Sequence, residues 1–100
     1  MYVLFTVGAD QEFEAFNGTI QTEWYSENVY VRICEYTDYE MREAWNLAEG
    51  KTGMEVVTFE VISDREYDER LVAAAAQVAS WGDGYDLRYL FPKTLHPVTA

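Results

Sequence analysis

The sequence predicts an α+β or α/β fold, a single small domain in which two α-helices pack on one β-sheet of about 4–6 strands. Runs of β-branched and aromatic residues, separated by turn residues, recur along the chain and are typical of strands. Two capping boxes, each followed by apolar residues at helical spacing, mark the starts of two helices. The predicted order contains two strand–helix–strand passages, which favour right-handed crossovers within one sheet.

The N-terminal part predicts a strand followed by a hairpin. Residues 2–7 (YVLFTV) form an apolar run without polar alternation, which fits a central strand covered on both faces. If Asn17 and Gly18 make a two-residue type I′ turn, Glu12 pairs with Glu23 and the hairpin has one apolar and one acidic face. The apolar face would hold Phe13, Ala15, Ile20 and Trp24, and the acidic face Glu12, Glu14, Gln21 and Glu23. The alternative is a short helix over residues 10–16 that ends at Gly18.

Strands and helices then alternate. Residues 28–36 and 54–62 have strand composition, and each is followed by a capping box. Thr37 with Glu40 begins a helix of about three turns, which Gly50 is expected to end. Ser63 with Glu66 begins a longer helix that ends near Trp81, and its alanine-rich centre suggests close approach to a neighbouring element.

The C-terminal part predicts one more strand and a tail. Residues 85–91 (YDLRYLF) are the last strand candidate. Residues 92–100 contain two prolines and little to bury, so we expect a loose tail there. The globular domain is therefore predicted to span residues 1–91.

Composition narrows the classes of function. The formal net charge is −11, from 18 acidic and 7 basic residues, which disfavours direct binding to nucleic acid or to an anionic membrane. A hydrophobic content of 49% with 16% aromatic residues indicates a folded chain rather than a disordered acidic one. We find neither a secretory signal pattern nor an apolar stretch near the ~20 residues of a membrane span, so the expected location is cytoplasmic.

Catalytic patterns are sparse. The only histidine, His96, lies in the predicted tail, and the only cysteine, Cys34, lies in a predicted strand where a thiol behaves as a small hydrophobe. One His and one Cys cannot supply a zinc site of the usual ligand types, and phosphate-binding glycine loops are missing. The acidic group of residues 64–69 fits the first turn of a helix and its solvated face. We therefore predict that the protein is not an enzyme and uses no cofactor. A carboxylate-based or metal-dependent enzyme is the least favoured hypothesis.

The distribution of charge is the unusual feature. Residues 1–31 contain five acidic residues and no Lys or Arg, and acidic residues with interleaved tyrosines continue into the first helix. One interpretation is that these charges keep the protein soluble and prevent its strand edges from pairing with other chains. The other is a surface that meets a basic partner, with same-face carboxylates about 6.5 Å apart along a strand. The candidate partner-binding residues are Glu12, Glu14, Glu23, Glu27, Asp38, Glu40, Glu43, Tyr25 and Tyr39.

In composition and size the chain resembles the small acidic inhibitors by which phages block nucleic-acid-binding host defences, including DNA mimics and anti-CRISPR proteins. Proteins that hold nucleic acid present Lys and Arg to closely spaced anions, and an acidic face can occupy the same groove. We therefore predict a binding module that occludes a basic surface of a nucleic-acid-binding protein. The alternative is a structural or accessory subunit that assembles, for example as a homodimer, through its aromatic surface.

Overall fold

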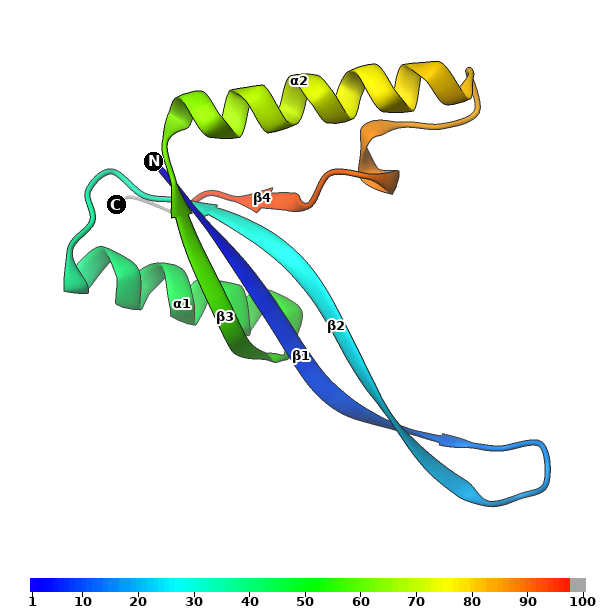
Figure 1. Ribbon diagram of the computed structural model, residues 1–100. Helices are drawn as coiled ribbons and strands as arrows, with labels where there is room; N and C mark the ends of the chain where they lie inside the picture. The colour runs from blue at the N-terminus through cyan, green and yellow to red at the C-terminus, as the bar shows by residue number, and fades with distance from the viewer. Residues whose placement is uncertain (98–100) are drawn as a thin grey trace.

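Four strands form one mixed sheet in the order β3-β1-β2-β4 in the computed structural model, which describes residues 1–97 (Figure 1). The strands are β1 (Tyr2–Glu14), β2 (Ile20–Arg32), β3 (Glu55–Ile62) and β4 (Lys93–Leu95). β1 pairs antiparallel with β2 and with β3, and β2 pairs parallel with β4. The predicted α+β class is confirmed, and the YVLFTV run lies on a central strand.

Two long strands replace the four short ones predicted for the N-terminal third. The run at residues 2–7 continues into the first strand of the hairpin as β1, and the second hairpin strand continues into residues 28–32 as β2. Each strand has 13 residues. Neither is interrupted by a Gly-Pro or Asn-Gly turn signal, since the one such signal, Asn17-Gly18, lies between them. β2 ends at Arg32 rather than at residue 36. Cys34 therefore lies in the following loop and is exposed. The prediction that Cys34 lies in a strand and behaves as a small hydrophobe is wrong.

Both helices begin where the capping boxes predict. The helix α1 (Asp38–Thr52) starts after Thr37, whose hydroxyl accepts the Glu40 N–H at 3.2 Å. It continues past Gly50, the predicted stop, and ends at Gly53, which adopts the left-handed conformation at φ 70°. The helix α2 (Asp64–Trp81) starts after Ser63, whose hydroxyl accepts the Glu66 N–H at 3.1 Å.

The core lies between α1 and one face of the sheet. Alternate residues of the two central strands are fully or almost fully buried there against two small helix residues, namely Val3, Phe5, Val7, Val29 and Val31 against Ala44 and Ala48. Alanine at these helix positions lets α1 approach the sheet closely. α2 covers only one end of the opposite face (Figure 1). Its Tyr67 ring stacks on Tyr2 there, with ring centroids 3.7 Å apart.

The C-terminal segment differs from the prediction in two places. Residues 85–91 do not form a strand. They contain one helical turn, in which the Phe91 N–H donates to the Leu87 carbonyl at 2.9 Å. Leu87 and Phe91 are four residues apart, so this turn places both side chains on its inner side. The predicted loose tail instead contributes β4, which covers the outer edge of β2 and buries Leu95. The last part of that tail, residues 98–100, lies outside the described residues.

The β1–β2 hairpin is much longer than the sheet that supports it. β3 accompanies β1 only as far as Gly8, and β4 accompanies β2 only over Val29–Val31. Residues 9–25, here called the hairpin arm, therefore project as a two-stranded ribbon (Figure 1). The radius of gyration is 16.4 Å, against about 13 Å for a compact chain of this length. The arm contributes to this extended shape, as does α2, which extends beyond the sheet (Figure 1).

Candidate functional site

The tip of the hairpin arm is a three-residue loop. The Ala15 N–H donates to the Thr19 carbonyl at 2.7 Å, and the Gly18 N–H donates to the Ala15 carbonyl at 2.9 Å. Gly18 has a φ of 81°, whereas Asn17 does not have a positive φ. A type I′ turn needs positive φ at both residues, so the loop is a type I turn closed by a left-handed glycine. The hairpin is confirmed over the short-helix alternative, and the predicted two-residue turn is wrong.

The longer loop shifts the pairing by one residue, and this redistributes the charges. Glu12 lies opposite Thr22, and Glu23 lies opposite Gln11, so the predicted Glu12–Glu23 pair does not form. A one-residue shift moves every side chain of one strand to the other face relative to its partner strand. The single acidic face is therefore wrong. Glu12 and Glu14 share a face with Asp10, and Glu23 lies on the opposite face, together with Glu27 at the base of the arm.

Exposed apolar side chains are interleaved with these carboxylates. Phe16 at the tip is fully exposed, at 111% of its reference area. Ile20 and Trp24 are exposed on the face of Glu12, and Phe13 and Tyr25 on the face of Glu23. Both faces of the arm thus combine negative charge with exposed aromatic side chains, and aromatic residues are enriched in protein interfaces.

The Trp24 side chain lies over the base of the arm. Its indole ring lies across the strand pair on Gly8, where a Cβ atom would overlap the ring. Gly8 is buried, although its neighbour along the same face, Asp10, is exposed. The ring therefore covers backbone at the point where the arm leaves the sheet.

The helix part of the predicted surface is not contiguous with the arm. Figure 1 shows that α1 begins at the side of the sheet away from the arm. Asp38, Tyr39 and Glu43 are exposed there, and a hydrogen bond to Glu43 raises the pKa of the Tyr39 hydroxyl. The Glu40 carboxylate instead accepts the Cys34 and Glu35 N–H groups, at 3.0 and 2.6 Å, and holds the loop before α1. Glu40 is thus a structural residue in this fold.

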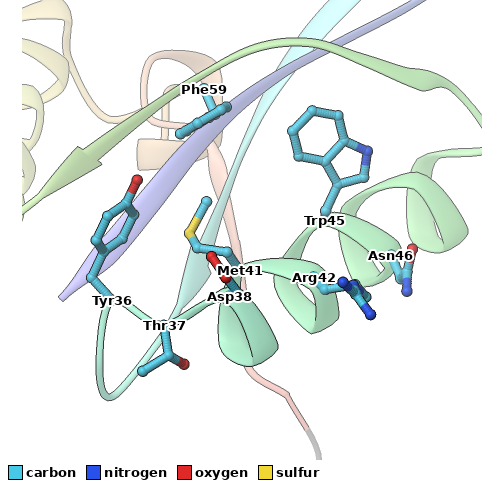
Figure 2. Close-up of a pocket in the computed structure, with 8 residues that line it drawn as sticks. All are labelled: Tyr36, Thr37, Asp38, Met41, Arg42, Trp45, Asn46 and Phe59. Atoms are coloured by element: carbon cyan, nitrogen blue, oxygen red, sulfur yellow. The ribbon is translucent and has the colours of Figure 1, made fainter.

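A pocket of about 350 Å³ lies beside the start of α1, in a place that sequence reasoning missed (Figure 2). Its lining includes Tyr36, Asp38, Met41, Arg42, Trp45 and Phe59. The helix residues of the pocket lie three or four positions apart, a spacing that predicts a helix and gives no signal of a pocket. Trp45 and Met41 pack only partly against the core. Their remaining surface is exposed beside β3, which is an edge strand of the sheet.

The other candidates from the sequence are explained by local pairing. On α2, Glu69 pairs with Arg65 at 3.2 Å and Glu66 with Arg70 at 2.8 Å, as expected for a solvated helix face. Over residues 1–97, the structure contains no group of three or more His, Cys, Asp or Glu side chains that could hold a metal ion. In the same range, neither helix is long and apolar enough to cross a membrane.

Comparison with known proteins adds no relatives: the chain matches no protein family, no curated protein and no solved structure.

Proposed function

We propose that this protein is a non-enzymatic binding module that inserts its hairpin arm into a basic groove of a nucleic-acid-binding protein and so occludes that groove. The observation that carries the proposal is a projecting arm with carboxylates on both faces and no basic residue in the first 31 positions. Nothing on the arm can neutralise its own charge, so a basic partner would gain the full attraction.

The division of the carboxylates between two faces changes the expected mode of binding. A single acidic face would dock flat on a basic surface. A ribbon with Glu12 and Glu14 on one face and Glu23 on the other presents negative charge to both walls of a groove. Proteins that hold a nucleic-acid strand in a groove line that groove with positive charge, which neutralises the phosphates. Insertion of the arm is therefore the mode that the arrangement supports best.

Charge reversal on the arm tests this proposal. The variant Glu12→Lys, Glu14→Lys, Glu23→Lys should lose the partner, because it places cations against both basic walls. A matched control, Glu55→Lys, Asp68→Lys, Asp83→Lys, changes the net charge equally at exposed positions outside the arm and should keep the partner. Tagged proteins would be used to capture partners from a lysate of the host or target cell, with elution by a salt gradient. The captured partner would then be tested for loss of bound DNA or RNA when the wild-type protein is added.

Two results would reject occlusion by the arm. One is a folded arm variant that still captures the partner, and the other is a partner that keeps its nucleic acid in the presence of this protein. Circular dichroism of both triple variants establishes whether they are folded, so that loss of binding is not confused with loss of structure.

A second candidate function is that of a structural or accessory subunit, and the exposed tip favours it. Phe16 and Ile20 are apolar and exposed, and both lie at the end of the arm. Such side chains act as anchors when a partner surface buries them. A self-association that resists salt and is lost in Phe16→Ser with Ile20→Ser would support assembly through the tip, with the acidity serving solubility. Analytical ultracentrifugation at low and high salt separates this outcome from occlusion.

A further inference from the structure

We propose that the pocket between α1 and β3, here called the aromatic cleft, binds the cationic end of an arginine or lysine side chain from a protein partner. The cleft lies beside the start of α1 and not on the hairpin arm, so this inference does not depend on insertion of the arm into a groove. The ligand class is a guanidinium or ammonium group carried on an apolar stem.

The aromatic rings of the cleft form a fixed corner. Trp45 and Phe59 meet edge to face, with ring centroids 5.8 Å apart and an interplanar angle of 66°. Behind them lies Phe5, which is fully buried and touches both rings, at centroid distances of 6.0 Å to Trp45 and 6.4 Å to Phe59. The core therefore holds the two walls in place. Tyr36, on the loop before α1, supplies a third ring across the opening (Figure 2).

A corner of this kind attracts cations. The face of an aromatic ring carries partial negative charge, and a cation within about 6 Å of several rings gains from each. A volume of about 350 Å³ has room for a guanidinium group and part of its stem. Met41 lines the base of the cleft and offers a polarisable surface to that stem.

The charges around the cleft favour a cation over an anion. Asp38 lines the cleft, and in Figure 2 its carboxylate lies beside the Met41 side chain. Arg42 also lines the cleft, and in Figure 2 its guanidinium group lies on the side of Asn46, apart from Tyr36 and Phe59. The formal net charge of −11 adds a long-range attraction for a basic partner and a repulsion for a second copy of this chain.

The test uses a pair of probes that differ in charge alone. N-acetyl-arginine amide carries the cation, and N-acetyl-citrulline amide has nearly the same shape and is neutral. Each would be titrated into the ¹⁵N-labelled protein at constant ionic strength, with the Trp45 indole N–H and the amides of residues 36–46 as reporters. We expect saturable shifts with the arginine probe and at least about threefold weaker binding of the citrulline probe.

Two variants locate the binding site without disturbing the core. Tyr36→Leu and Asp38→Asn alter exposed side chains at the opening of the cleft. Each should lower the affinity for the arginine probe about two- to tenfold. Asp83→Asn removes one negative charge in the exposed turn after α2 and should leave binding unchanged. Equal shifts with both probes would overturn the inference, as would shifts confined to the acidic arm with Trp45 unmoved. Unchanged affinity in Tyr36→Leu and Asp38→Asn would overturn it as well.

Discussion

The β1–β2 hairpin has two halves with the same alternation of side chains and different surroundings. In the inner half, Val3, Phe5 and Val7 are fully buried, because β3 pairs alongside and α1 covers their face. In the hairpin arm the same face of β1 continues through Phe13, which is exposed because no helix or third strand within residues 1–97 reaches it. Alternation therefore assigns a side chain to a face, and only the neighbouring elements decide whether that face is covered.

The comparison also bears on stability. The inner half belongs to a four-stranded sheet with a helix layer, so its opening requires loss of the core. The arm is a two-stranded ribbon, and isolated hairpins are marginally stable in water. We therefore expect the arm to open locally at a small cost in free energy, without unfolding the rest.

The largest predicted effect separates the two halves directly. Phe5→Ala should lower the free energy of unfolding by about 3–5 kcal/mol, because it leaves a cavity against the Trp45 and Phe59 rings. The matched change in the arm, Phe13→Ala, should cost less than about 1 kcal/mol, since its side chain is already 40% exposed and creates no cavity. Urea denaturation followed by circular dichroism measures both. Similar losses in the two variants would show that the arm is part of the core.

The next effect concerns the joint between the halves. Gly8→Ala should lower the free energy of unfolding by about 1–2 kcal/mol, because its Cβ atom would overlap the Trp24 ring and push it into solvent. In a Trp24→Ala background the same substitution should be neutral or stabilising by up to about 1 kcal/mol, since alanine has less backbone entropy to lose than glycine. The double-mutant cycle isolates the contact, and the indole N–H signal of Trp24 reports its displacement. If Gly8→Ala changed the free energy of unfolding equally in the wild-type and Trp24→Ala backgrounds, the position of the Trp24 ring would not depend on the missing side chain of Gly8.

Much of the fold could be predicted because its signals are local. The caps at Thr37 and Ser63 mark the helix starts, since each hydroxyl satisfies a backbone donor three residues later. The turn at Asn17-Gly18 could be placed but its type could not, because a left-handed glycine serves both a two-residue and a three-residue loop. That one-residue ambiguity was enough to assign Glu12 and Glu23 to the wrong relative faces.

The features that could not be predicted depend on contacts between distant parts of the chain. β4 is a short segment after Pro92. It forms a strand because it pairs with the edge of β2, which lies more than 60 residues earlier in the chain. The aromatic cleft arises because Phe59 of an edge strand meets Trp45 of α1. Candidate residues on one element, such as Glu12 on the arm, could be proposed from the sequence, and their separation from Asp38 on α1 could not.

A smaller effect concerns the second face of the packed half, where α2 makes few contacts with the sheet. Arg70 of α2 donates to Glu60 of β3 at 3.0 Å and lies 3.5 Å from the hydroxyl of the buried Tyr30. Arg70→Met should lower the free energy of unfolding by about 1 kcal/mol, because it breaks a partly buried charge-assisted contact and keeps the side-chain stem. The control Arg65→Met removes an exposed pair with Glu69 and should be nearly neutral. Thermal unfolding of both variants measures the difference, and equal shifts would show that Arg70 contributes no more than a surface pair.

The smallest effect on global stability, and the sharpest test of the comparison, lies at the tip of the arm. Gly18→Ala places a Cβ atom at a φ of 81°, which costs about 1–2 kcal/mol locally. If the arm opens independently, the global free energy of unfolding should change by less than about 0.5 kcal/mol, while exchange of the Ala15 amide should accelerate about tenfold. Gly18→Asn, which tolerates the left-handed conformation, should restore much of the protection. A global loss of more than about 1 kcal/mol in Gly18→Ala, with faster exchange at Phe5 and Val31 as well, would mean that the two halves unfold as one unit.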